Sequence, residues 1–329
     1  MFHHKELEKL LFDDFSDEEI DNIVVISGYV GLQPIGKLGE LEGKKSLIIY
    51  GMYGKEGILA PLHEGIVKAD EKMPNVSIMY STRPIHSKIY IGRSNKEIKF
   101  VKIGSANFSS SGLKNDGKEV LVDVDPVLFE KINSYFTWVK KKCIPCKKAE
   151  SKDIYRFKRE YGNAPRQTRA SKQVSAPKQT RDHDGCLLDF MDGKGNIPQE
   201  SGINWCFSSK GKVSPNDAYI PIRVGDIREN PGLFLPKKKN NKIVELLWDD
   251  GISMDGLLEA SVIVDGVKYP KQLCSSPRKA DLGEYLRRRL NVSSEKVVDI
   301  DDFKKYGRHN IGVTLIGDGQ YYLDFSVKK

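Results

Sequence analysis

A strongly basic stretch near the middle of the chain most constrains what the protein can fold into. Residues 140–182 carry 14 Lys or Arg against 4 Asp or Glu and contain few large aliphatic side chains. Such a composition cannot bury a core, so we expect a linker here. The flanking residues 1–139 and 183–329 have 17 basic against 20 acidic residues and 22 against 21. The sequence therefore predicts two nearly neutral domains, 1–142 and 183–329, joined by a basic linker at 143–182.

The charge of this linker indicates a polyanionic partner, because each phosphate that a cation neutralises releases counterions. A linker that only improves solubility is the alternative. Elsewhere the chain has no apolar run of membrane-spanning length, and its first 20 residues are acidic and amphipathic, unlike a signal peptide. We therefore expect a cytoplasmic protein without a membrane partner.

The five cysteines are scattered and odd in number, which favours reduced thiols. Cys143 and Cys146 form a lone CxxC pair. A structural zinc site needs two further Cys or His ligands, and none follows at a suitable spacing. The sequence therefore predicts no metal site.

The two flanking regions differ in pattern. Before the linker, apolar runs rich in β-branched residues predict strands, and two helical periodicities predict helices at 61–73 and 126–142. These strands are expected at 22–30, 45–54, 76–81, 86–92, 98–104 and 119–125. The combination indicates an α/β layer fold.

After the linker, short alternating strands are separated by Asp-Gly and Gly-Asp turns, which is typical of an antiparallel barrel or sandwich. One helix is expected at 280–290. Because Leu286 and Leu290 share one face of that helix, the arginines of the Leu-Arg-Arg-Arg-Leu run are expected to face water.

Polar side chains recur on and after two of the predicted N-terminal strands. His86 and Lys88 are two residues apart, so they share one face of a strand. The next strand ends at Gly104-Ser105, which leaves Asn107 near the same end of the sheet. Glycine allows a close backbone approach, and the hydroxyl and amide add hydrogen-bond donors. The cluster is therefore suited to bind phosphate.

Phosphoryl transfer is the chemistry that such a cluster can perform. A neutral imidazole can attack phosphorus while Lys and Asn side chains bind the non-bridging oxygens. The attacking ring needs a carboxylate to orient it, for which Glu119 is the candidate, and the leaving oxygen needs a second, protonated imidazole. No other histidine of the chain has a matching Lys and Gly-Ser, so the second imidazole is expected from another copy of the chain. The alternative is an ordinary strand histidine in a chance HxK pattern.

The pattern HSK, GSAN and a following Glu resembles the signature of the phospholipase D superfamily, specifically its short bacterial nuclease branch, in which dimerisation completes the site. SGYV near Gly28, SGINW at 201–205 and WDDG at 248–251 extend a resemblance to the NgoFVII/NgoAVII family of restriction endonucleases over nearly the whole chain outside the linker. This resemblance implies an α/β phospholipase-D-like nuclease domain, with a mixed sheet flanked by helices. A mainly β, B3-like pseudobarrel that binds DNA would follow it.

The resemblance also implies roles for the motif residues. His86 would be the nucleophile that forms a phosphohistidine, and His86 of a second copy would be the general acid. Lys88 and Asn107 would bind the scissile phosphate, Ser105 would assist them, and Glu119 would orient His86.

One residue departs from the superfamily pattern, because Arg93 stands where an Asp usually follows the motif Lys. Since this loss is common in the nuclease branch, it indicates branch membership rather than inactivity. No metal or other cofactor is expected at the chemical step. Some relatives act beside a separate ATP-driven helicase or translocase subunit, so ATP and Mg would enter only through such a partner. The chain has no phosphate-binding GxxxxGK[ST] loop of its own.

For the second domain, the resemblance implies two arms that grip double-stranded DNA in the major groove. The first arm would carry Asn204, Trp205, Ser208, Ser209, Lys210 and Lys212, and the second Gln272, Ser275, Ser276, Arg278 and Lys279. Further phosphate contacts are expected from Arg223, Lys237 and Lys238. The alternatives are a core position for Trp205, as for Trp248, and a solvated turn for the lysine run.

Two functions from different classes follow. The first is a sequence-specific DNA endonuclease that acts as a homodimer. The second is a sequence-specific DNA-binding protein whose nuclease-like domain is inactive and only dimerises. A lipid phosphodiesterase would share the first chemistry, but the sequence offers no amphipathic membrane element for it.

Overall fold

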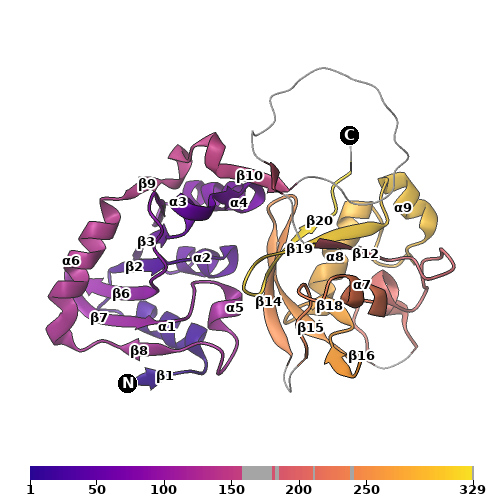
Figure 1. Ribbon diagram of the computed structural model, residues 1–329, viewed down its shortest axis with the longest axis horizontal. Helices are drawn as coiled ribbons and strands as arrows, with labels where there is room; N and C mark the ends of the chain where they lie inside the picture. Colours follow the sequence, from indigo (N-terminus) through magenta and orange to yellow (C-terminus); the bar gives the residue numbers. More distant parts are fainter. Residues whose placement is uncertain (158–179, 182–184, 210–211, 238–240, 328–329) are drawn as a thin grey trace. The chain divides into compact units, whose positions relative to one another are not determined.

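The computed structural model describes residues 1–157, 180–181, 185–209, 212–237 and 241–327 (Figure 1). They divide into two compact units, the first covering the chain up to Phe157 with residues 180–181 and the second beginning at Gly185. Each unit has its own sheets and its own core.

The first unit is built on an eight-stranded mixed sheet. Its strand order is β1-β8-β7-β6-β2-β3-β5-β9. The central strands β2, β3 and β5 are parallel, and the other pairings are antiparallel. The strands are β1 (Phe2–His3), β2 (Asn22–Ser27), β3 (Lys45–Tyr50), β5 (Val76–Ser81), β6 (Ile89–Ser94), β7 (Glu97–Gly104), β8 (Leu121–Asp123) and β9 (Cys143–Pro145).

Helices cover both faces of this sheet. Figure 1 shows α6 on one face and α1, α2 and α4 on the other. The apolar side of α6 packs on alternate residues of β2 and β6, including Val24 and Ile89, as its helical periodicity predicts. The resulting α/β layers confirm the fold class predicted for this region. The helices are α1 (Leu7–Ser16), α2 (Leu32–Gly39), α3 (Tyr53–Glu56), α4 (Ala60–Lys72), α5 (Ser110–Leu113), η1 (Pro126–Leu128) and α6 (Phe129–Lys140).

The first unit continues past the boundary that the sequence predicts at residue 142. Strand β9 pairs with β5, and β10 (Ile154–Phe157) pairs with β4 (Ile58–Leu59) and with β11 (Thr180–Arg181). Between them η2 (Cys146–Lys148) buries the Cys146 side chain completely, and η3 (Ser151–Asp153) follows. Residues 143–157 therefore belong to the first unit and not to a linker. Their few apolar residues, set among lysines, give no periodic signal.

The remainder of the predicted linker, residues 158–179, lies outside the described residues.

The second unit is a nearly closed sheet of seven strands in the order β12-β19-β20-β14-β15-β18-β13. Its end strands β12 and β13 approach each other, and β14 with β20 is the one parallel pair in this sheet. This pseudobarrel confirms the predicted mainly β, B3-like fold. The strands are β12 (Gly185–Asp189), β13 (Ile220–Pro221), β14 (Lys242–Trp248), β15 (Ser253–Glu259), β18 (Gln272–Ser275), β19 (Asn310–Gly317) and β20 (Gln320–Asp324), with a separate hairpin of β16 (Val262–Val264) and β17 (Val267–Tyr269).

Helices pack against the core of the pseudobarrel. Trp248 is completely buried there, and its ring lies 4.4 Å from that of Tyr285 in α8. Helix α8 matches the predicted helix within one residue at its start. The helical segments are η4 (Gly202–Phe207), α7 (Val224–Glu229), α8 (Lys279–Leu290) and α9 (Ile300–Tyr306).

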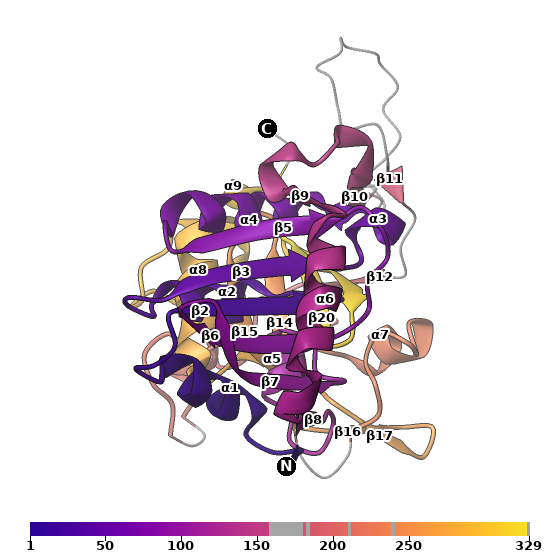
Figure 2. The ribbon, with the colours of Figure 1, turned by 90° about the vertical axis from the view of Figure 1, so that its left-hand side faces the viewer.

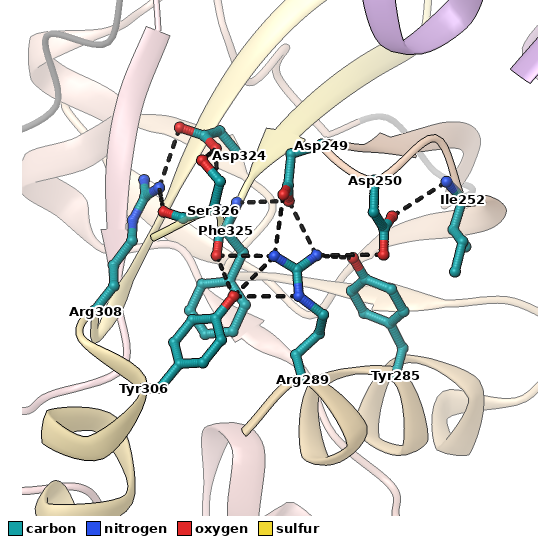
Figure 3. A network of polar contacts seen from close by, with 10 residues as sticks. All are labelled: Asp249, Asp250, Ile252, Tyr285, Arg289, Tyr306, Arg308, Asp324, Phe325 and Ser326. Atoms are coloured by element: carbon teal, nitrogen blue, oxygen red, sulfur yellow. Dashed lines mark hydrogen bonds and ion pairs between the residues drawn. The ribbon is translucent and has the colours of Figure 1, made fainter. Parts of the chain in front are cut away.

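The arginines of α8 correct the expectation that all of them face water. Arg287 is only 2% exposed, and Arg288 is exposed. Arg289 lies at the centre of a polar network (Figure 3), where it donates to both carboxylate oxygens of Asp249 at 3.1 and 3.0 Å and to the Phe325 carbonyl at 3.0 Å. Helical periodicity identified the leucine face but neither the burial of Arg287 nor the ion pairs of Arg289.

Candidate active site and DNA-binding surface

The motif residues of the first unit gather at one end of its sheet. Parallel strands β2 and β3 end there, β7 ends there at Gly104, and the antiparallel β6 begins there. Figure 2 shows α6 running across one face of this sheet. The sequence predicts a strand from residue 86, but β6 begins at Ile89, so His86 and Lys88 lie in the segment that leads into it.

His86 and Lys88 lie in direct contact. The Lys88 ammonium is 3.0 Å from Nδ1 and 3.2 Å from Nε2 of His86, and it donates to the His86 carbonyl at 2.7 Å. The Lys88 residue is only 6% exposed, whereas His86 is exposed. The imidazole is therefore open to a substrate, while the ammonium is held beneath it in a fixed position.

Charge around the pair favours the neutral imidazole. Burial and then the Lys88 ammonium lower the pKa of His86, while Glu56 opposes this effect. Burial also lowers the pKa of Lys88, and Glu119 opposes that effect. Only a neutral imidazole has a lone pair with which to attack phosphorus, so this environment favours the nucleophilic form.

Asn107 is oriented by the loop that follows β2. Its Oδ1 accepts from the Tyr29 backbone N–H at 3.2 Å and from the Ser27 hydroxyl at 3.4 Å. The preceding carbonyl, of Ala106, accepts from the buried Tyr90 hydroxyl at 2.7 Å. With its oxygen engaged by this loop, the Asn107 amide is left to donate through nitrogen, as binding of an anionic oxygen requires.

Gly28 closes the site on this side. A Cβ atom added at Gly28 would lie 2.8 Å from Cδ2 of His86 and 3.4 Å from Oδ1 of Asn107. The backbone of the Ser-Gly-Tyr segment therefore touches the imidazole directly, and no side chain fits between them.

Ser105 and Glu119 lie in two segments that are bonded to each other. The Ser105 hydroxyl accepts from the Val120 N–H at 3.1 Å, and the Ser105 N–H donates to the Val120 carbonyl at 3.0 Å. Glu119 is half-buried in the bend before β8, and its carboxylate acts on Lys88. Among the described residues, no hydrogen bond joins Glu119 to His86. The structure thus brings Glu119 to the lysine of the motif and not, as the sequence predicts, to its histidine.

Arg93 does not occupy the site. It pairs with Asn22 at the opposite end of the sheet, donates to Asn133 Oδ1 at 2.9 Å and lies 5.2 Å from the ring centre of Phe136 in α6. The departure at this position therefore leaves the cluster around His86 untouched.

In the second unit, two residues predicted to contact DNA are structural instead. Asn204 is completely buried, and its side chain bonds the Pro198 carbonyl and both backbone groups of Val298 at 2.8 to 3.0 Å. The Ser275 hydroxyl donates to the Arg278 carbonyl at 2.6 Å and accepts from the Leu282 N–H at 2.8 Å, which fixes the start of α8.

The two predicted arms are side by side at their bases. The Ala218 N–H donates to the Lys279 carbonyl at 3.4 Å, and a Cβ at Gly283 would meet the Asn216 carbonyl oxygen at 1.8 Å. The chain that leaves the first arm thus packs directly on the start of α8, and β13 pairs with β18 beside it. Gly283 is a residue that sequence reasoning missed, because its role is a close approach across the fold.

The other predicted DNA contacts differ in how open they are. Ser209, Lys212 and Arg278 are exposed, although Arg278 is paired with Asp281 and Glu284. Gln272 and Lys279 both bond Glu259, Arg223 bonds the Met191 carbonyl, and Lys237 donates to the Ala260 carbonyl at 2.7 Å. Ser208 is buried, Ser276 and Trp205 are half-buried, and the ring of Trp205 packs on Tyr219. Lys210 and Lys238 lie outside the described residues.

Two family models match the chain. The NgoFVII restriction endonuclease N-terminal PLD domain matches residues 5–153, and the NgoFVII C-terminal B3-like DNA-binding domain matches residues 177–316. The chain belongs to the NgoFVII restriction endonuclease family. The first match includes every residue of the cluster around His86, and the second includes both arms of this NgoFVII-family protein.

Solved structures similar to the nuclease domain have low sequence identity. NucT from Helicobacter pylori is 18% identical over 44% of this chain and 99% of its own, with a TM-score of 0.33. Nuc from Salmonella typhimurium, a phospholipase D family member, is 16% identical over 44% and 93%, with a TM-score of 0.32. Phosphatidylserine synthase of Haemophilus influenzae Rd KW20 is 13% identical over 46% and 40%, with a TM-score of 0.34. None of the curated proteins matches the chain.

No group of three or more His, Cys, Asp or Glu side chains in the described part of the chain is placed to hold a metal ion. None of the helices described is both long and apolar enough to span a membrane.

Proposed function

We propose that this NgoFVII-family protein cleaves double-stranded DNA at specific sequences through a covalent phosphohistidine on His86, with no metal at the chemical step. The observation that carries the proposal is the contact between the exposed His86 imidazole and the buried Lys88 ammonium, with the Asn107 amide fixed beside them. These are a nucleophile and two donors for a phosphate, on rigid supports.

The chemistry then proceeds in two displacements. A neutral His86 nitrogen attacks phosphorus, a P–N bond forms, and the P–O bond to the leaving strand breaks as an imidazolium donates its proton to that oxygen. The same second imidazole, now neutral, takes a proton from water, whose oxygen attacks phosphorus and breaks the P–N bond. Lys88 and Asn107 stabilise the charge on the non-bridging oxygens in both steps.

In this proposal the imidazolium comes from a second copy of the chain. His3 bonds Asp123, His63 bonds the Tyr80 hydroxyl, and His309 bonds Asp189, so each has its own partner away from His86. His4 lies beside Phe2 near the chain start, and His183 falls outside the described residues. A homodimer through the nuclease domain would place two His86 rings on one phosphate, one as nucleophile and one as acid.

The pseudobarrel supplies the DNA contacts in this proposal. Lys212 and Ser209 of the first arm and Arg278 of the second are exposed and would contact phosphates or base edges, and the two arm bases pack on each other. A helicase or translocase partner that brings ATP and Mg is compatible with this arrangement.

The test separates chemistry from recognition. Bis(4-nitrophenyl) phosphate reports phosphodiester cleavage without a recognition sequence, and a mixture of plasmids with sequencing of the fragment ends reports specific cutting. Wild-type protein should hydrolyse the small diester in EDTA and form an acid-labile adduct on His86, whereas the His86→Ala variant should do neither. If EDTA abolishes hydrolysis, the mechanism is wrong. Sequence-specific DNA binding without hydrolysis by the wild type would support the alternative of an inactive nuclease-like domain.

A further inference from the structure

One residue outside the His86, Lys88 and Asn107 motif contacts both His86 and Asn107. The ring of Tyr29 meets the His86 ring edge-on, with centres 6.0 Å apart and planes at 83°. Its backbone N–H donates to Asn107 Oδ1 at 3.2 Å, and its hydroxyl donates to the Glu56 carboxylate at 2.8 Å. Tyr29 thus connects the nucleophile, a phosphate donor and a carboxylate that the motif does not include.

Glu56 reaches this place because two loops are bonded together. The Gly51 N–H donates to the Ser27 carbonyl at 2.8 Å, and the Met52 N–H donates to the Gly28 carbonyl at 3.1 Å. Helix α3 follows at once and carries Lys55 and Glu56 on a single turn. The loop after β2 and the loop after β3 therefore form one unit beside the imidazole.

The charges that face His86 come from several elements. Lys88 lies on its own segment, Lys55 and Glu56 on α3, and Glu119 faces Lys88 from the bend before β8. Of these, Glu56 is the anion that acts on the imidazole, while Lys88 and Lys55 act in the opposite sense. Burial, and then Glu56, raises the pKa of Tyr29 to about 12, so its hydroxyl keeps its proton and donates to Glu56.

We propose that Tyr29 and Glu56 are positioning residues of the active site: Tyr29 holds the His86 ring and the Asn107 amide, and Glu56 fixes Tyr29 and faces His86 with a negative charge. This inference rests on the proposed function. The proposed dimer needs one neutral and one protonated His86. If the only charges near His86 were the ammonium groups of Lys88 and Lys55, they would disfavour the protonated imidazole that acts as the general acid. Glu56 supplies the opposing charge, so that one ring of the pair keeps its proton.

The first experiment follows the His86 ring itself. The full-length protein is labelled with carbon-13 histidine and titrated by NMR, and the His86 signal is identified by its loss in the His86→Ala variant. Glu56→Gln should move the titration midpoint to lower pH, because an anion is lost. Lys55→Gln should move it to higher pH, because a cation is lost. Glu18→Gln, an exposed carboxylate in the turn before β2 at the opposite end of the sheet, is the charge-matched control and should leave the midpoint unchanged.

The second experiment measures hydrolysis of bis(4-nitrophenyl) phosphate against pH. The rate should be greatest at the pH where one His86 ring is neutral and the other is protonated, so the pH optimum of hydrolysis should follow the titration midpoint of His86. We expect the pH optimum to fall for Glu56→Gln and to rise for Lys55→Gln. Tyr29→Phe keeps the ring but loses the bond to Glu56, so we expect a loss of about tenfold in kcat. Tyr29→Ala removes the ring and should cost about 100-fold.

The outcomes distinguish the two proposals. If the wild type hydrolyses the diester but Glu56→Gln keeps both the His86 midpoint and the pH optimum, this inference is overturned and the proposed function stands. If the wild type does not hydrolyse the diester, the proposed function fails, and the NMR midpoints still decide whether Glu56 acts on His86. Circular dichroism spectra like those of the wild type show that each variant is folded.

Discussion

The nuclease domain and the DNA-binding domain use their polar residues in opposite ways. Around His86 the motif residues converge on an exposed imidazole, and their hydrogen bonds leave groups free for a substrate. In the pseudobarrel, Asn204 and Ser275 were predicted to contact DNA, yet their side chains hold the backbone in place. Phosphoryl transfer demands a few residue types in fixed geometry, whereas a DNA-binding arm can use any exposed polar side chain.

The largest expected effect is that of replacing His86 in the nuclease domain. His86→Ala should lower DNA cleavage about 10,000-fold, because the covalent route is lost. Specific DNA binding, measured by gel shift on fragments that the wild type selects, should remain within about twofold of wild type. A variant that loses binding as well would show that His86 supports the fold and that the two domains are not functionally separate.

The next effect concerns the scaffold of the pseudobarrel (Figure 3). Arg289→Ala would remove the cation that pairs with the Asp249 carboxylate and one of the two donors to the Phe325 carbonyl, and we expect a loss of about 3–5 kcal/mol in the free energy of unfolding. Urea denaturation measures it. Arg288→Ala is the matched control on the next residue, and since that side chain is exposed, its cost should stay below about 0.5 kcal/mol. Equal costs for both variants would contradict a stabilising role for the polar network around Arg289.

A smaller loss is expected for a residue that the sequence assigned to DNA. Asn204→Ala should cost about 2–3 kcal/mol in unfolding free energy, because the buried Val298 N–H and carbonyl and the Pro198 carbonyl lose the Asn204 side chain as a partner. Ser209→Ala, in the same arm but exposed, should leave stability unchanged. If Asn204→Ala instead weakened DNA binding without a change in stability, the original prediction of a DNA contact would be restored.

The sequence predicted features that depend on local patterns but not those that depend on contacts between distant segments. The strands and the proximity of His86, Lys88 and Asn107 were predictable, because apolar periodicity and a short motif are local signals. Tyr29, Glu56 and Gly283 were not, since each acts through a contact between segments far apart in the chain.

The predicted linker shows the limit of composition. Residues 143–157 look like a basic tether, but a few apolar side chains, with Cys146 buried among them, are enough to join them to the first unit. A charge count sums over many residues and does not detect so few anchoring positions.

The smallest expected effect concerns two lysines of the predicted DNA-binding arms, Lys212 and Lys279. Lys212 is exposed, whereas Lys279 is paired with Glu259, which overcomes the effect of burial and raises the pKa of this lysine. A cation that already has a protein carboxylate neutralises less phosphate charge. Lys212→Ala should therefore weaken DNA binding up to about tenfold. It should also reduce the slope of log binding constant against log salt concentration by the equivalent of about one phosphate contact. Lys279→Ala should change the salt dependence less. Binding isotherms at several salt concentrations measure both, and a larger salt effect for Lys279 would mean that DNA displaces Glu259 and recruits the second arm.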